Sequence, residues 1–147
     1  MKHLIFALTL LFSLTNVQAQ NTNPDAIVGK WNTEEDKGVI EIYKWSSKYY
    51  GRILTVAEPN GKDGKPLVDA KNPNEKLRNR PIIKLEILKD FKYNGDNLWT
   101  EGKIYDPETG NSYSCKITLI DKNTIEVRGF MGVALIGRTT TWKRKLN

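Results

Sequence analysis

From residue 29 onward, short β-prone segments alternate with turn signals, and this alternation constrains the fold more than any other feature of the sequence. Residues 113–119 alternate between apolar and polar side chains, as expected of a strand with one buried face. Residues 94–97 and 106–110 carry Asn-Gly and Asp-Pro-Glu-Thr-Gly, which are strong turn sequences. No long helical periodicity is present, so the pattern predicts an all-β fold.

The spacing predicts about eight strands in up-and-down antiparallel order. That number suits a closed barrel, in which the first and last strands meet and leave no exposed sheet edge. We expect the strands at residues 29–31, 39–44, 49–56, 81–88, 98–105, 113–119, 125–128 and 138–145.

The first nineteen residues predict a secretory signal peptide. Lys2 supplies a positive end, residues 4–14 form a short apolar run, and Ala19 ends a small-residue cleavage sequence. The run is too short to span a membrane. We therefore expect residues 20–147 to be exported as a single domain, either to the periplasm or out of the cell.

Two compositional features limit the possible functions of that domain. Removal of Lys2 lowers the formal charge from +6 to about +5, and the basic residues are interleaved with acids rather than clustered. A nucleic-acid site requires clustered basic residues, so no nucleic-acid partner is expected. The single histidine, His3, lies in the signal peptide and the single cysteine is Cys115, so an imidazole-based catalytic site, a histidine metal site and an internal disulfide are not expected. We predict no metal, no cofactor and no enzyme activity.

Cys115 allows two interpretations. It lies on the apolar face of its predicted strand, where a free cysteine usually behaves as a small buried hydrophobe. A reactive thiol would instead need exposure and a nearby cation, which Arg128 or Arg138 could supply.

Residues 58–80 have no sustained apolar period and are rich in Pro and Gly, which predicts one long loop that could act as a lid. A helical turn is expected at residues 73–77, with Asn72 as its N-cap. Arg78, Asn79 and Arg80 follow this turn. The two guanidiniums could clamp a carboxylate or phosphate, or they could pin the loop by pairing with an acid such as Glu75 or Asp69.

The last strand and the segment before it leave further alternatives open. Arg138, Thr140, Trp142 and Arg144 share one face of the strand. If this face points inward, Arg138 favours an anionic amphiphile in the lumen; if it points outward, Thr139 and Thr141 line the lumen. The apolar residues 129–137 either cap the barrel or form a tip that contacts a membrane or a partner.

Several motifs, taken together and in this order, resemble domain-of-unknown-function family 2147, whose members are exported bacterial proteins. They are Leu77-Arg78-Asn79-Arg80-Pro81, Gly102-Lys103-Ile104-Tyr105-Asp106-Pro107, Tyr113-Ser114-Cys115-Lys116, Arg128-Gly129-Phe130-Met131-Gly132 and Gly137-Arg138-Thr139. The resemblance implies a lipocalin-like barrel in a Gram-negative envelope, without an established activity.

Gly29-Lys30-Trp31 and the late Arg144 are similar to the lipocalin pattern, in which a tryptophan plugs the closed end of the barrel and a basic residue packs over it. The resemblance thus implies a structural plug formed by Gly29, Trp31 and Arg144. A ligand-stacking role is better suited to Trp99 or Trp142.

Our first hypothesis is an exported binding protein that holds an apolar or amphiphilic small molecule in the barrel lumen. The predicted ligand-binding residues are Arg78, Asn79, Arg80, Trp99, Tyr113, Cys115, Arg138 and Trp142. The second hypothesis is an envelope protein-interaction module with a filled barrel. The third is an enzyme that uses Cys115 or carboxylates such as Glu101 and Asp106.

Overall fold

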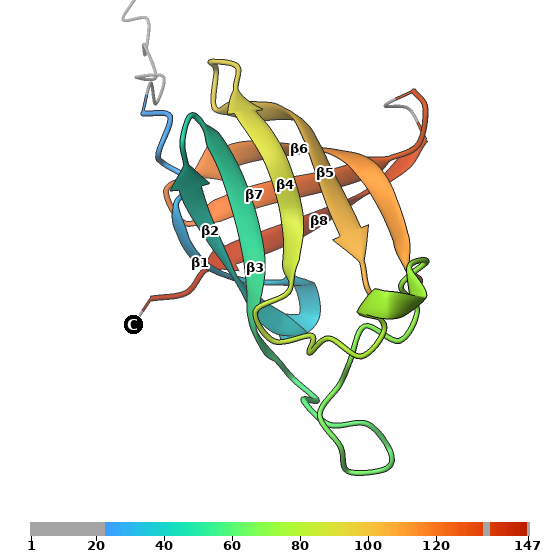
Figure 1. Cartoon of the computed structure of the whole chain (residues 1–147). Coiled ribbons are helices and arrows are strands. Elements are labelled where there is room, and N and C mark those ends of the chain that lie inside the picture. Colours follow the sequence, from blue (N-terminus) through green and yellow to red (C-terminus); the bar gives the residue numbers. More distant parts are fainter. Residues whose placement is uncertain (1–22, 134–135, 147) are drawn as a thin grey trace, which may run out of the picture.

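The computed structural model describes residues 23–133 and 136–146 and shows a closed barrel of eight antiparallel strands in sequence order (Figure 1). The strands are β1 (Gly29–Asn32), β2 (Gly38–Trp45), β3 (Lys48–Val56), β4 (Glu86–Tyr93), β5 (Leu98–Asp106), β6 (Asn111–Asp121), β7 (Thr124–Phe130) and β8 (Gly137–Arg144). Each strand pairs with the next, and β8 pairs with β1. The predicted up-and-down barrel is confirmed, whereas the predicted signal peptide lies outside the described residues.

One end of the barrel is covered by the segment that precedes β1, shown in blue in Figure 1 beside the β2–β3 turn. Ile27 of this segment is fully buried. The carbonyl of Pro24 accepts a hydrogen bond of 3.0 Å from the indole of Trp99, and Asp25 accepts one of 2.6 Å from the hydroxyl of Tyr49. These bonds fix the segment across the barrel end, which is therefore the closed end.

Side chains fill much of the barrel interior because large residues lie opposite glycines. Phe91 and Leu88 are fully buried. A Cβ at Gly102 would collide with the ring of Phe91, and a Cβ at Gly51 would lie 2.7 Å from Cδ1 of Leu88. The absence of these two side chains allows Phe91 and Leu88 to extend across the interior, as close packing requires.

The long connection between β3 and β4 differs from the prediction, because the strand expected at residues 81–88 begins only at Glu86. The backbone N–H of Leu85 donates to the carbonyl of Ile82 at 3.0 Å, and Lys84 has a positive φ of 70°. This turn buries Ile82 and Leu85 and leaves Ile83 38% exposed. The strand predicted from residue 81 was therefore wrong for residues 81–85, where the apolar residues belong to a turn with its own buried side chains.

The helical turn in this connection is a 3-10 helix, η2 (Glu75–Leu77), capped by Asn74 rather than Asn72. The side chain of Asn74 accepts a bond of 3.1 Å from the N–H of Lys76. Asn72 accepts from the N–H of Asn74 at 2.8 Å and donates to Asp69 at 2.8 Å. The predicted N-cap was wrong by two residues because Asn72 holds the loop together instead of capping the helix.

A second 3-10 helix, η1 (Glu34–Asp36), links β1 to β2 at the end opposite the N-terminal segment. In the part of the chain that the structure describes, no helix is long and apolar enough to cross a membrane.

Candidate functional site

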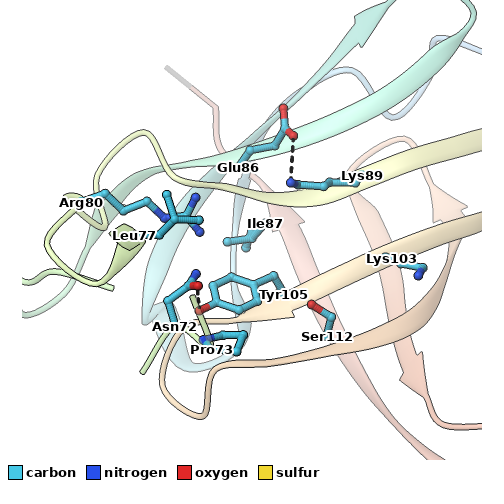
Figure 2. Close-up of a pocket in the computed structure, with 10 residues that line it drawn as sticks. All are labelled: Asn72, Pro73, Leu77, Arg80, Glu86, Ile87, Lys89, Lys103, Tyr105 and Ser112. Atoms are coloured by element: carbon cyan, nitrogen blue, oxygen red, sulfur yellow. Dashed lines mark hydrogen bonds and ion pairs between the residues drawn. The ribbon is translucent and has the colours of Figure 1, made fainter. Parts of the chain in front are cut away.

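A pocket of about 260 Å³ lies between the β3–β4 connection and the outer face of β4, β5 and β6 (Figure 2). On these strands Leu88, Gly102 and Cys115 are buried and face inward, so the neighbouring residues Lys89, Lys103 and Ser114 face outward. A register shift in the β3–β4 ladder pairs Glu86 with the exposed Arg52, which brings Glu86 to the outer face as well. The lining residues are Asn72, Pro73, Leu77, Arg80, Glu86, Ile87, Lys89, Lys103, Tyr105 and Ser112. The pocket therefore lies outside the barrel wall and not in its lumen.

The loop side of the pocket is held against the barrel by Asp69, a carboxylate with no exposed surface. Asp69 accepts a bond of 2.6 Å from the hydroxyl of Tyr105 and one of 2.8 Å from the amide of Asn72. Arg80 adds two contacts, at 2.9 Å from Nε and 2.7 Å from Nη2. Burial by itself would raise the pKa of Asp69, but these donors outweigh it and hold that pKa below its ordinary value.

The sequence left two roles open for the Arg78–Arg80 cluster, to clamp an anionic ligand or to pin the loop by pairing with a nearby acid. The structure contains the ion pairs of the loop-pinning role. Arg80 pairs with Asp69, and Arg78 pairs with Glu75 at 3.1 Å while Nε donates to the carbonyl of Asn72 at 2.9 Å. Arg80 also lines the pocket, whereas Arg78 and the exposed Asn79 are not among its lining residues. Both arginines thus secure the loop that forms one wall.

The strand side of the pocket combines an apolar floor with positive charge. Ile87 is buried there beside the ring of Tyr105 (Figure 2). Lys89 and Lys103 are directly opposite each other on β4 and β5, and Lys89 forms an ion pair of 3.7 Å with Glu86 (Figure 2). Two like charges in such a cross-strand pair repel each other. An anion bound between them would relieve this repulsion.

These strand residues were not predicted as site residues. The alternation of β5 could have identified Lys103 and Tyr105, because they flank the inward-facing Ile104 and so share the outer face. Their proximity to Asn72 and Arg80 depends on how the loop folds back, for which the sequence contains no local signal.

The tryptophans proposed as ligand-binding residues lie in the core. Trp99 is fully buried and Trp142 is 4% exposed. Because Trp142 belongs to the buried core, its face of β8 points inward at this level, where its indole donates to the hydroxyl of Thr140 at 3.0 Å.

Tyr113 and Arg138 lie nearer the other end of the barrel. Tyr113 is partly exposed and pairs with Ile104 across the β5–β6 ladder. The side chain of Arg138 is 74% exposed and forms an ion pair of 3.0 Å with Glu34 of η1. Neither residue lines the pocket on the outer face.

Cys115 is 2% exposed, and burial raises the pKa of its thiol to about 12. A thiol in this state is protonated at neutral pH and shielded from reagents, which are the properties of a structural cysteine. Across residues 23–133 and 136–146, no three or more His, Cys, Asp or Glu side chains come together as metal ligands.

At the closed end, the structure brings Gly29, Trp31 and Arg144 together. Trp31 is fully buried and its indole donates to the carbonyl of Ile27 at 2.8 Å. The guanidinium of Arg144 lies 4.2 Å from the Trp31 ring centre and donates to the carbonyls of Ala26 and Val28 at 2.7 and 3.0 Å. Gly29 has a φ of 135°, and a Cβ there would lie 2.7 Å from Nη1 of Arg144.

The barrel is similar to a solved structure described as "Protein HP1028 from the human pathogen Helicobacter pylori belongs to the lipocalin family". The TM-score is 0.72 and the sequence identity 25%, over 82% of this chain and 83% of that chain. The fold is thus lipocalin-like, and barrels of this kind in general bind small molecules. This similarity favours a binding protein over an enzyme. A search of curated proteins found no match.

A model of a bacterial family, described as "Uncharacterized protein conserved in bacteria (DUF2147)", matches residues 29–144, from the first strand of the barrel to the last. The chain belongs to this family.

Proposed function

We propose that this protein is an exported binding protein for a small anionic amphiphile, and that the ligand binds in the pocket beneath the β3–β4 connection. The observation that carries the proposal is the cross-strand pair of Lys89 and Lys103 beside an apolar floor, in which Lys89 has one acidic partner, Glu86, at 3.7 Å. A carboxylate or phosphate head group would bind between the two ammonium groups, and a short apolar tail would lie against Ile87 and Leu77.

The position of this pocket moves the proposed site away from the lumen. Phe91 and Leu88 occupy the interior, so a ligand there would have to displace buried core side chains. The outer pocket requires no such displacement. Its volume of about 260 Å³ is slightly below the usual range of about 300–1,000 Å³ for ligand pockets, which favours a single-chain amphiphile over a larger lipid.

The proposal can be tested by calorimetric titration with dodecanoate and by native mass spectrometry of protein purified gently from its own host. We expect saturable binding of one dodecanoate per chain. Lys89→Gln combined with Lys103→Gln should weaken it by at least about tenfold, the change expected from losing ~1.4 kcal/mol of charge-assisted binding.

The matched control is Lys62→Gln combined with Lys65→Gln, which removes two exposed lysines from the far part of the same connection. This control should bind like the parent. Equal affinity in the Lys89/Lys103 double variant and the parent would contradict the proposed site, and an absence of dodecanoate binding would contradict the proposed ligand class.

The second hypothesis, an envelope protein-interaction module, is favoured by a separate observation. The interior is packed, and Met131, Val133 and Ile136 in the β7–β8 connection are 62%, 62% and 66% exposed. Replacement of these three residues by Ser would abolish cross-links to a partner in intact cells under this hypothesis. Under the first hypothesis, a small-molecule binding protein, the same variant would bind dodecanoate with the affinity of the parent.

A further inference from the structure

A group of aromatic side chains lies on the outer face of the β2–β3 hairpin, apart from the pocket just described. Trp45 is 69% exposed, although the other three tryptophans of the chain are all buried. Its ring lies 5.9 Å from that of Tyr50 at 67°, and Tyr50 stacks on Tyr43 at 6.0 Å and 25°. The hairpin therefore presents a continuous aromatic surface with one largely exposed indole.

A pocket of about 280 Å³ lies beside this indole, lined by Trp45, Ser46, Ser47, Lys48 and Tyr50. Both serines are exposed, and a hydroxyl can donate as well as accept a hydrogen bond. Ser46 has a positive φ of 57°, as the favoured two-residue hairpin turns require, so the turn fixes the position of its hydroxyl.

Two of the lining residues, Lys48 and Tyr50, are held in place by a carboxylate on the neighbouring strand. Asp90 on β4 accepts bonds on Oδ1 from the ammonium of Lys48, at 2.8 Å, and from the hydroxyl of Tyr50, at 3.1 Å. The Asp90 side chain remains 51% exposed, so a ligand hydroxyl can still reach it. Donors and acceptors therefore border the aromatic surface at fixed positions.

The charges around this surface neutralise one another in pairs. Lys48 pairs with Asp90 at 2.8 Å, Arg52 with Glu41 at 2.7 Å, and Lys44 with Asp25 at 2.8 Å. An anionic ligand or an anionic lipid surface would have to compete with these internal pairs. A neutral ligand with many hydroxyl groups would not, because hydroxyls can bond to a charge pair without replacing either partner.

We infer that this surface is a second binding site, specific for a neutral oligosaccharide. The C–H face of a pyranose ring, which carries partial positive charge, would stack on the negative face of the Trp45 indole. The hydroxyls at the ring edge would bond to Asp90, Lys48 and the serines. This site is independent of the proposed amphiphile pocket, because the two share no lining residue.

The exposure of Trp45 provides a direct test. Acrylamide quenching of tryptophan fluorescence would be measured during titration with cellotetraose, maltotetraose and tetra-N-acetylchitotetraose. We expect at least one of these tetrasaccharides to protect the accessible tryptophan saturably, with a dissociation constant in the millimolar range or below. Trp45→Ala should weaken binding by at least about tenfold when measured by calorimetry.

Two control variants distinguish a role of Trp45 in binding the oligosaccharide from a role in stabilising the fold. Trp45→Phe retains an aromatic face and should bind within a few-fold of the parent. Ile120→Ala removes a side chain that is 53% exposed on another strand and should leave binding unchanged. Circular dichroism would verify that each variant is folded.

Three results would overturn the inference. They are failure of all three tetrasaccharides to protect the tryptophan, unchanged affinity in Trp45→Ala, and protection by phosphatidylglycerol vesicles but by no sugar. The last result would assign the surface to a membrane. Dodecanoate binding stays available as a separate readout of the first pocket in every variant.

Discussion

Substitution of Asp69 tests whether a buried charge holds the β3–β4 connection against the barrel. Removing one partner of a buried ion pair typically costs about 3–5 kcal/mol. The Arg80 side chain is 36% exposed and can regain water, so the lower end of this range applies. We expect Asp69→Asn to lower the free energy of unfolding by about 3 kcal/mol, because the new amide places donors against Arg80 and Asn72.

The stabilisation that Asp69 provides should depend on pH in a defined direction. Because the folded-state pKa of Asp69 lies below its ordinary value of 3.8, its stabilisation is fully present above that value. It is lost as the pH falls through the folded-state pKa. Denaturant unfolding followed by circular dichroism should therefore show a constant difference between parent and Asp69→Asn at neutral pH, and a shrinking one below about pH 4.

Asp63→Asn is the matched control, because Asp63 lies in the same connection but is exposed and forms no ion pair with another described residue. Its effect should stay within about 0.5 kcal/mol. A loss below about 1 kcal/mol in Asp69→Asn would refute the buried-charge argument. The same conclusion would follow if the difference between parent and variant persisted unchanged in acid.

Three further predictions concern the barrel itself. Trp31→Ala should lower stability by about 3–5 kcal/mol in denaturant unfolding, and a loss confined to ligand binding would contradict a structural role. Gly102→Ala should lower the free energy of unfolding by about 1–3 kcal/mol, because the new Cβ meets the ring of Phe91. Adding Phe91→Leu to this variant should recover part of the lost stability. Unchanged stability in Gly102→Ala would mean that the interior has free space. Cys115 should resist thiol reagents at pH 8 in the folded protein and react fully after unfolding, since burial raises its pKa to about 12; rapid reaction before unfolding would contradict this.

The sequence was sufficient to predict the barrel because local signals define most strands. Alternation on β6 placed Cys115, Ile117 and Leu119 on one buried face, as observed. Turn sequences such as 94–97 and 106–110 separated consecutive strands correctly. Among the strands, local pattern failed where a turn imitated it, at residues 81–85, because a buried i, i+3 pair and a strand face give similar short apolar runs.

The outer pocket was less predictable because it depends on contacts between distant segments. Asp69 and Tyr105 are 36 positions apart and meet only when the loop folds back over β5. Arg80 was recognised as a site candidate, and its pairing with Asp69 was foreseen as one alternative. The opposing Lys89 and Lys103 could not be foreseen, because the register between β4 and β5 sets that pair.

The way the barrel is packed explains why binding is proposed on its outer surfaces. Gly51 and Gly102 face inward where Leu88 and Phe91 cross the interior, so the space that a ligand could occupy holds core side chains. A rigid, filled barrel can still position binding groups, because each strand fixes alternate side chains on its outer face. The β3–β4 connection then supplies one wall of a pocket, and the β2–β3 hairpin supplies an aromatic surface. A rigid barrel of this kind keeps both sites in place without opening its core.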